Sequence, residues 1–316
     1  RWVFKVKHTP EGAIERYKAR LVAKGFAQRE GVDYGELFAP TSHTSALRAF
    51  FAVAAMRKLM VHQLDVSTAF LNGELDEELY MEQPEGYVDQ RRHMVCRLRK
   101  SIYGLKQAPR CWYDKLALEF GKLGLHPSAA EPALFVMSAG VKRTYVLVHV
   151  DDMLVASEDE QLVVAAKAAI NVAFKIRDLG IARRYVGIDL AWEGPGIVTL
   201  SQERYIVELA ERFGMRDAKA RTIPLPADAR ARPTDPEDEL LENPTQFREL
   251  VGCLNYVAVS TRPDVAFALS FLGRYFANPT RQGLVYARDV LRYLVGSKEL
   301  RLCLLYTSPS PRDAHE

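Results

Sequence analysis

Two adjacent carboxylates, Asp151 and Asp152, stand between two short apolar segments of the sequence. Carboxylates this close repel each other, and burial beside apolar strands removes the water that would stabilise their charge. A bound cation would offset both costs. A third carboxylate, Asp65, stands near the end of another apolar segment, and we expect parallel placement of that strand beside the acidic corner to bring the three groups together. An Asp-Asp pair by itself is also typical of an ordinary turn.

Carboxylate oxygens with room for water and phosphate oxygens favour Mg2+ over zinc. Two such ions, about 4 Å apart, activate a hydroxyl nucleophile and stabilise a pyrophosphate leaving group. We therefore expect a site for two Mg2+ ions, with Mn2+ as a substitute. Structural zinc is not expected, because the cysteines are too widely separated to form a CxxC pair. They are Cys96, Cys111, Cys253 and Cys303.

The composition is that of a globular protein, since 316 residues with 48% apolar side chains can bury one large core or two ordinary ones. No apolar run approaches the roughly 20 residues that cross a bilayer, so no membrane partner is expected. The sequence begins at Arg1 without an initiator Met or a signal-peptide pattern, and we interpret it as a fragment of a longer protein.

The net charge of +3 is unevenly distributed along the chain. A first basic block contains Lys5, Lys7, Arg16, Lys18, Arg20, Lys24 and Arg29, and a second contains Arg91, Arg92, Arg97, Arg99, Lys100, Lys106, Arg110 and Lys115. An acidic stretch over 74–85 separates them. Such blocks attract a polyanion such as nucleic acid, although a charge run is also typical of a solvated face.

The elements that must position these residues follow from apolar periodicity and turn signals. We expect a hairpin of strands over 2–7 and 17–26 with a turn at 9–12, a buried strand over 61–66 and a second hairpin over 145–157 with the acidic corner at its tip. Further strands are expected over 185–192 and 197–201. Helices are expected over 45–58, 109–123, 161–174, 202–213, 244–260, 263–275 and 281–294, with a linker over 220–244.

Eight segments, in order along residues 1–303, resemble the motifs of Ty1/copia-type retrotransposon reverse transcriptases. They are RYKARLVAKGF at 16–26, LDVSTAFLNG at 64–73, YMEQPEG at 80–86, SIYGLKQAPR at 101–110, VDDML at 150–154, DLG at 178–180, YVGI at 185–188 and TRPD at 261–264. Each motif alone is weak, but the ordered series is highly specific.

The resemblance implies an α+β fold with the right-hand architecture of a polymerase. Residues 1–60 would form the fingers and 61–200 the palm, with an interleaved fingers segment at about 74–115. An antiparallel palm sheet would carry the catalytic carboxylates. Residues 201–304 would form a helical region like a thumb or connection, and 305–316 fit nothing in the family and are interpreted as an extraneous tail.

The resemblance also implies roles for individual residues. Asp65, Asp151 and Asp152 would be the catalytic metal ligands, with the Val66 carbonyl as a further ligand. Substrate-binding residues would be Lys7, Lys18 and Arg20 toward the triphosphate, Phe70 beneath the sugar, and Gly104, Gln107 and Pro109 around the nascent base pair. Residues in contact with the primer would be His149, Tyr185 and Gly187.

Structural alternatives remain for several of these residues. Gly104 and Pro109 also suit the end of a strand and the start of a helix, and Tyr185 and Phe70 suit a core. His149 stands where the family usually has Tyr. By the period of two along a strand, we expect His149 to share a face with Asp151 and to lie near the primer terminus.

Three functions remain open from the sequence. The first is an RNA-directed DNA polymerase that takes an RNA or DNA template with a primer and deoxynucleoside triphosphates. The second is a catalytically decayed remnant that only binds nucleic acid, which His149 favours. The third, an unrelated RNA-dependent RNA polymerase, is disfavoured by the large ring of Phe70.

The resemblance further implies that the chain works within a Pol polyprotein. Its partners would be integrase and ribonuclease H segments of the same polyprotein. Its location would be intracellular, in the cytoplasm within a virus-like particle, with entry into the nucleus.

Overall fold

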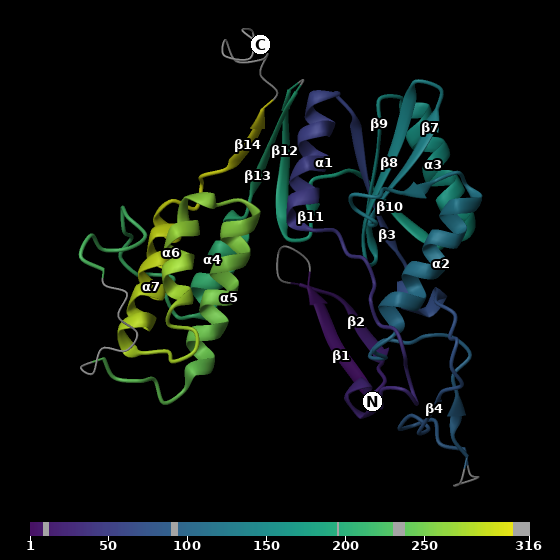
Figure 1. The fold of residues 1–316 in the computed structure, drawn as a ribbon, viewed down its shortest axis with the longest axis horizontal. Coiled ribbons are helices and arrows are strands. Elements are labelled where there is room, and N and C mark those ends of the chain that lie inside the picture. The colour runs from purple at the N-terminus through teal and green to yellow at the C-terminus, as the bar shows by residue number, and fades with distance from the viewer. Residues whose placement is uncertain (9–12, 90–93, 195, 230–237, 306–316) are drawn as a thin grey trace. The chain divides into compact units, whose positions relative to one another are not determined.

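The computed structural model describes residues 1–8, 13–89, 94–194, 196–229 and 238–305 (Figure 1). The expected turn at 9–12, Arg91 and Arg92, part of the expected linker and residues 306–316 of the expected tail lie outside these ranges. The chain forms two compact units, which are described separately. Unit 1 consists of Arg1–Leu47 and Leu59–Ala182, and unit 2 of Arg48–Lys58 and Arg183–Glu316.

Unit 1 contains a six-stranded sheet in the order β10-β3-β9-β8-β7-β6, in which all neighbours pair antiparallel (Figure 1). Its strands are β3 (Met60–Val66), β6 (His126–Pro127), β7 (Leu134–Ala139), β8 (Lys142–His149), β9 (Asp152–Ser157) and β10 (Ile176–Ile181). The expected parallel placement of the Asp65 strand is therefore wrong. β3 runs antiparallel to its neighbour β9, and this register sets Asp65 directly opposite Asp152.

Two helices cover one face of this sheet. Helix α2 (Ala108–Lys122) begins with Pro109 in its first turn, where a missing backbone N–H costs nothing. Helix α3 (Glu160–Ala173) is capped by Asp159, whose carboxylate accepts a hydrogen bond from the Gln161 backbone N–H at 2.9 Å. The helices and strands share one apolar core, built from residues such as Leu64, Leu116, Phe120, Val146, Val148, Met153, Val155, Val163 and Ile170.

Strand alternation places Asp65, Asp152 and His149 on the other face of the sheet. Leu64 and Val66 of β3 lie in the core beneath the helices, so Asp65 between them points to the opposite face. Asp152 of β9 and His149 of β8 share that opposite face, because they lie in register with each other and with Asp65. The sheet therefore carries its carboxylates on the side free of α2 and α3.

A separate hairpin of β1 (Trp2–His8) and β2 (Ile14–Leu21) forms the N-terminal part of unit 1. β2 ends five residues earlier than the expected limit at residue 26, and Gly25–Ala27 form the short helix η1. The physical reason is a change of partner: beyond Val22, the Ala23 backbone N–H donates to the Tyr103 carbonyl at 2.8 Å. Two short strands, β4 (Tyr80–Met81) and β5 (Cys96–Arg97), pair with each other in a separate two-stranded sheet.

Unit 2 combines an antiparallel sheet with a helical bundle. The sheet order is β11 (Arg184–Tyr185), β12 (Ile188–Gly194), β13 (Ile197–Ser201) and β14 (Leu302–Leu305). The helices are α4 (Glu203–Arg212), α5 (Pro244–Ser260), α6 (Ala266–Gly273) and α7 (Arg281–Gly296), with short η3 (Pro263–Val265) before α6. Helix α1 (Thr44–Met56) contributes residues to both units. The bundle core includes Phe247, Leu250, Leu254, Leu272 and Leu294, all fully buried.

The structure of unit 2 differs from three of the expectations. The strand expected over 185–192 is interrupted by a turn at Val186 and Gly187. The helix expected over 263–275 consists of η3 followed by α6. Leu305, assigned to the tail, is the last residue of β14, where it pairs with Ile197. The mixed α and β composition with antiparallel sheets is confirmed. Within the described ranges, no helix has both the length and the apolarity to span a membrane.

Candidate active site

Asp65, Asp151 and Asp152 lie together at one end of the unit 1 sheet. Asp65 and Asp152 are cross-strand neighbours, and all three residues are half-buried. The Val66 backbone N–H donates to the Asp151 carbonyl at 2.7 Å, which ties the end of β3 to the turn that carries Asp151. The structure thus brings together the acidic residues that the sequence had placed on separate segments.

Electrostatics at this cluster favour a cation. Burial raises the pKa of Asp152, and the negative charge of Asp151 raises it further, with a smaller contribution from Asp65. Gln63 opposes the shift by donating to Asp152 Oδ1 at 3.4 Å. Among the described residues, no three His, Cys, Asp or Glu side chains converge as a ready metal shell. The donor types and their mutual repulsion fit a hard divalent ion.

The turn between β8 and β9 is strained. Val150 has a φ of 59°, a value that a β-branched residue rarely adopts. Such a conformation costs about 1–3 kcal/mol and persists where the surroundings hold it. Trp112 of α2 supplies that support, because its buried indole Nε1–H donates to the Val150 carbonyl at 2.7 Å. The position of Asp151 therefore depends on a helix that is distant in sequence.

His149 lies beside the carboxylates, on the same face of the sheet as Asp65 and Asp152. β8 ends at His149, so the period of two does not continue through the turn to Asp151. His149 instead pairs across the strands with Asp152. Its Nδ1 lies 3.0 Å from the Ser42 hydroxyl oxygen, which fixes the direction of the imidazole ring.

The β1–β2 hairpin presents its basic side chains on one face. Lys5 pairs across the strands with Lys18, Lys7 with Arg16, and Val3 with Arg20, so these cations share a side of the hairpin. Burial lowers the pKa of Lys18, and Arg20, Lys7 and Arg16 lower it further, while Asp65 opposes the shift. The influence of Asp65 on Lys18 indicates that Lys18 lies within electrostatic range of that carboxylate.

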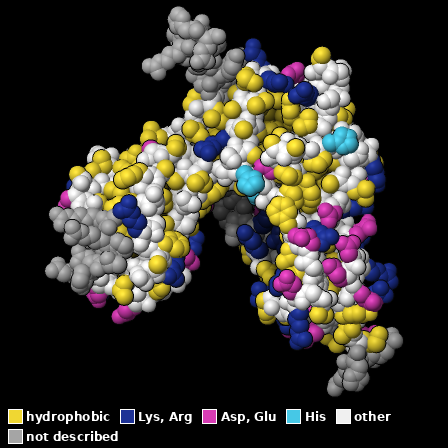
Figure 2. Space-filling view, in the orientation of Figure 1, with side chains coloured by type: hydrophobic (Ala, Val, Ile, Leu, Met, Phe, Trp, Pro, Cys, Tyr) yellow, Lys and Arg dark blue, Asp and Glu magenta, His cyan; other side chains and the backbone are white. Residues whose placement is uncertain are grey.

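The second basic block is partly neutralised within unit 1, through Arg97, Arg110 and Lys115. Its partners belong to the acidic stretch: Arg97 pairs with Glu78 at 3.2 Å, Arg110 with Asp76 at 3.4 Å and Lys115 with Glu74 at 3.2 Å. On the face drawn in Figure 2, basic and acidic side chains are interspersed around β4 and the start of α2. No ion pair in the described part of the chain involves Lys7, Lys18 or Arg20. The hairpin is therefore the stronger candidate for contact with a polyanion.

Phe70 and Tyr103 form an aromatic pair next to the acidic cluster. Phe70, in the short helix η2 (Ala69–Asn72), is half-buried and packs edge-to-face on Tyr103 with 5.0 Å between ring centroids. The Arg20 guanidinium lies over the Tyr103 ring, with its Cζ 5.4 Å from the ring centroid. Burial raises the pKa of Tyr103, the charge of Asp151 raises it further, and Arg20 opposes the shift.

Tyr103 is a candidate functional residue that the sequence analysis missed. In the SIYGLKQAPR segment, roles were expected only for the glycine, the glutamine and the proline. The aromatic side chain of Tyr103 in the same segment could also have indicated a contact with substrate. Only the structure shows that this ring joins Arg20 to Phe70.

The other residues of this segment join the hairpin to α2. Gly104 has a φ of 91°, and a Cβ there would lie 2.3 Å from the Ala23 carbonyl oxygen, so its close approach is to the hairpin backbone. Gln107 is buried; its side chain donates to the Asp33 carbonyl at 2.9 Å and accepts from Gln28 at 2.9 Å. Pro109 follows them in the first turn of α2, and the contact with the nascent base pair expected for Gly104, Gln107 and Pro109 stays a prediction.

Tyr185 and Gly187 belong to unit 2, where Tyr185 is the last residue of β11 and Gly187 lies in the β11–β12 turn. Tyr185 is completely buried, so its side chain belongs to the core and the expected primer contact by that ring is corrected. The half-buried residues of the turn are Val186 and Gly187, with φ values of 47° and 76°. Positive φ at both central residues is the mark of a type I′ hairpin turn.

Comparison with known proteins decides the family. The sequence model described as reverse transcriptase (RNA-dependent DNA polymerase) matches residues 1–227. The chain belongs to the reverse transcriptase family. It is 38% identical over 98% of its length to the retrovirus-related Pol polyprotein from transposon TNT 1-94 of Nicotiana tabacum, and 39% identical over 94% to that from transposon RE1 of Arabidopsis thaliana. The resemblance to Ty1/copia-type reverse transcriptases is thereby confirmed.

The reverse transcriptase chain covers only part of these relatives. It spans 24% of the tobacco polyprotein and 20% of the Arabidopsis polyprotein. A shorter relative, the putative transposon Ty5-1 protein of Saccharomyces cerevisiae, is 32% identical over 78% of this chain and 79% of its own length.

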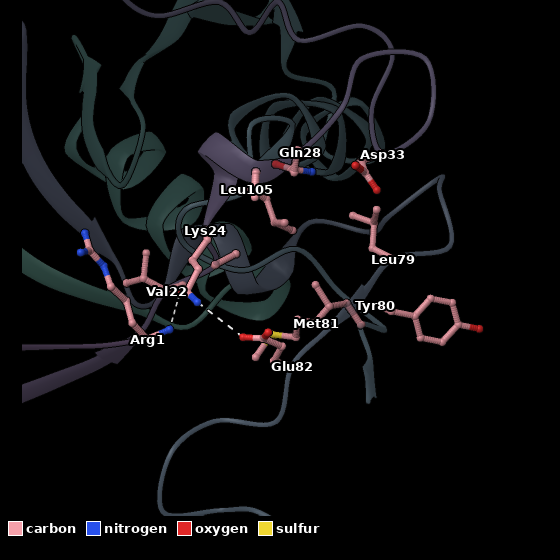
Figure 3. A pocket seen from close by; sticks show the side chains of 13 residues that line it. Arg1, Val22, Lys24, Gln28, Asp33, Leu79, Tyr80, Met81, Glu82 and Leu105 are labelled. Carbon is pink, nitrogen blue, oxygen red and sulfur yellow. Dashed lines mark hydrogen bonds and ion pairs between the residues drawn. The ribbon is translucent and has the colours of Figure 1, made fainter. Parts of the chain in front are cut away.

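A pocket of about 380 Å3 lies elsewhere in unit 1 of this reverse transcriptase (Figure 3). Its lining joins the end of β2 to β4, with Val22, Leu79 and Leu105 among its apolar residues. Lys24 and Glu82 pair across it at 3.4 Å, as the dashed line in Figure 3 shows. None of the three clustered carboxylates lines this pocket, so the acidic site is an open feature of the sheet rather than this cavity.

Replacing Asp152 by Asn is expected to raise the Tm of the metal-free protein at neutral pH. The pKa of Asp152 is raised in the folded state, so stability falls as the pH rises from the ordinary Asp pKa of about 3.9 through the folded value. A neutral amide removes this penalty, and the gain in Tm should disappear as the pH is lowered toward about 4. Thermal unfolding at several pH values measures it, and a lower Tm at neutral pH would contradict the assigned repulsion.

Proposed function

We propose that the chain is the polymerase part of a retrotransposon reverse transcriptase, an RNA-directed DNA polymerase. The observation that carries this proposal is that Asp65, Asp151 and Asp152 lie together at one end of the sheet, within electrostatic range of the basic face of the β1–β2 hairpin. Its substrates would be deoxynucleoside triphosphates and an RNA or DNA template with its primer. In this assignment the hairpin belongs to the fingers, the six-stranded sheet to the palm, and the helices of unit 2 to a thumb-like region.

The carboxylates Asp65, Asp151 and Asp152, with the Val66 carbonyl, would hold two Mg2+ ions, or Mn2+ as a substitute. When bound, such a pair of ions supplies activation of the primer hydroxyl and charge neutralisation at the pyrophosphate. The residues of this chain keep the carboxylates in place. β-sheet register aligns Asp65 with Asp152, and Trp112 holds the turn that carries Asp151.

The nucleotide would lie between the basic hairpin and the aromatic pair. Arg20, with Lys18 and Lys7 on the same face, would contact the triphosphate, for which a planar guanidinium is well suited. Phe70 would lie beneath the sugar, and Tyr103 would orient both Phe70 and Arg20 through its two ring contacts. Gly104, Gln107 and Pro109 would set the distance between the hairpin and α2.

Arg20→Ala is expected to raise the KM for the nucleotide by roughly 10-fold or more, while template affinity changes little, because a charge-assisted contact to the nucleotide alone is lost. Steady-state extension kinetics and duplex-binding titrations measure the two effects. Arg16→Ala is the matched control, since it removes the same charge from the same face without a Tyr103 contact. Equal loss of nucleotide and template binding would assign Arg20 a structural role.

The direct test is primer extension by the purified chain on an RNA template with Mg2+. Extension that requires deoxynucleotides and the metal would support the polymerase. Duplex binding without extension would favour the second candidate, a decayed nucleic-acid-binding remnant. That candidate is favoured by His149, which replaces the usual Tyr of the family and is hydrogen-bonded to Ser42 beside Asp152.

The polyprotein context extends this proposal. The plant relatives are Pol polyproteins several times longer than this chain. We propose integrase and ribonuclease H segments as partners within one polyprotein, and an intracellular location in a virus-like particle, with later entry into the nucleus.

A further inference from the structure

Two turns of this chain are held by the same type of hydrogen bond. Four non-glycine residues in the described ranges have positive φ: Lys58, Thr68, Val150 and Val186. The two valines both lie in hairpin turns, and each valine carbonyl accepts a hydrogen bond from an aromatic side chain of a helix. Trp112 of α2 donates to Val150, and the Tyr256 hydroxyl of α5 donates to Val186. The first of these turns carries Asp151.

Tyr256 and the β11–β12 turn fit closely within unit 2. A Cβ added at Gly187 would lie 3.2 Å from the Tyr256 hydroxyl, so the turn backbone rests directly on that oxygen. The Tyr256 ring is half-buried and packs edge-to-face on Tyr205 of α4 with 5.3 Å between centroids. Burial raises the pKa of Tyr256, so its hydroxyl stays a donor across the working pH range.

The chemistry of the turn explains why it needs this partner. A type I′ turn favours Asn or Gly at its first central position, whereas Val186 is β-branched and disfavours positive φ. Without the tyrosine hydroxyl, the Val186 carbonyl would lose a hydrogen bond that is partly shielded from water, and the turn would gain access to other conformations. The aromatic donor therefore determines which conformation the turn presents.

We propose that Tyr256 is a positioning residue that holds the Val186–Gly187 turn in the conformation that supports the primer strand. The inference rests on the proposed polymerase function and on the assignment of this turn to the primer. It adds a residue of the helical bundle to the machinery for primer retention. Tyr256 acts through the turn and need not touch the nucleic acid.

The test compares Tyr256→Phe with Tyr205→Phe in the full chain. Each variant loses one phenolic oxygen from the same aromatic cluster, but the Tyr205 hydroxyl hydrogen-bonds Cys253 rather than the turn. Primer–template dissociation is measured with a labelled duplex and a heparin trap. Tyr256→Phe should dissociate roughly 10-fold faster and terminate after fewer additions, with an unchanged nucleotide KM. Tyr205→Phe should behave as wild type.

A rescue separates turn positioning from general loss of stability. Glycine tolerates positive φ, so Val186→Gly in the Tyr256→Phe background should restore slow dissociation without restoring the hydroxyl. Fast dissociation that persists in the double variant would overturn the inference.

Gly187→Ala strains the turn directly. It separates two questions: whether the turn supports the primer, and whether Tyr256 positions the turn. If Gly187→Ala speeds dissociation while Tyr256→Phe matches Tyr205→Phe, the turn supports the primer but Tyr256 does not position it, which overturns this inference alone. If neither variant changes dissociation in a chain that extends primers, both the primer role of the turn and the inference are overturned, and the polymerase function stands.

Discussion

Replacing Asp151 by Asn is expected to abolish primer extension while leaving affinity for the primer–template duplex nearly unchanged. The carboxylate charge is needed to hold the catalytic cations, whereas duplex affinity comes mainly from Lys and Arg contacts to phosphates. The rate should fall by roughly 10³-fold or more, which corresponds to about 4 kcal/mol of transition-state stabilisation. Single-turnover extension and duplex-binding titrations measure the two quantities separately.

The matched control for this substitution is Asp114→Asn on α2. Asp114 is an exposed carboxylate that pairs with Arg110 at 3.4 Å, so its loss should change the extension rate little. Extension by Asp151→Asn at a rate near wild type would contradict the metal-ligand assignment. A parallel loss of duplex affinity would show that Asp151 acts on the fold rather than on the chemistry.

Phe70→Val is expected to raise incorporation of ribonucleotides relative to deoxynucleotides by roughly 10- to 200-fold, measured as the ratio of kcat/KM values. A large ring beneath the sugar leaves no space for a 2′-hydroxyl, and valine enlarges that space. The location of Phe70 fits this role, because its ring is half-buried beside Tyr103 and follows the strand that carries Asp65. The same ring also packs against the apolar core, so a stability cost of about 1–4 kcal/mol should accompany the change.

Phe120→Val separates the two contributions of Phe70. Phe120 is fully buried in the same core and lies on α2, so its truncation leaves a cavity without altering the sugar pocket. It should lower the free energy of unfolding and leave the sugar preference unchanged. An unchanged sugar preference in a folded, active Phe70→Val protein would mean that Phe70 belongs to the core alone.

Local patterns predicted much of the fold. The apolar runs on either side of Asp151 and Asp152 indicated a hairpin with an acidic tip, and the sheet contains it as β8 and β9. The spacing of Trp112, Leu116 and Phe120 indicated a helix, found as α2. These features depend on side-chain periodicity within one segment, which a sequence displays directly. The ordered motifs likewise indicated the family before any geometry was known.

Only the tertiary structure decided how distant segments meet. Nothing local to β3 specifies an antiparallel neighbour, and the alignment of Asp65 with Asp152 comes from the register of the assembled sheet. His149 lies beside the carboxylates because it pairs with Asp152 across the strands. Strand alternation does not continue through Val150, and residue type alone does not reveal the positive φ of that residue. The contacts of Tyr103 with Arg20 and Phe70 join three separate segments. The sequence by itself therefore determined the chemical groups and their local elements, whereas long-range packing and register decided which groups face one another.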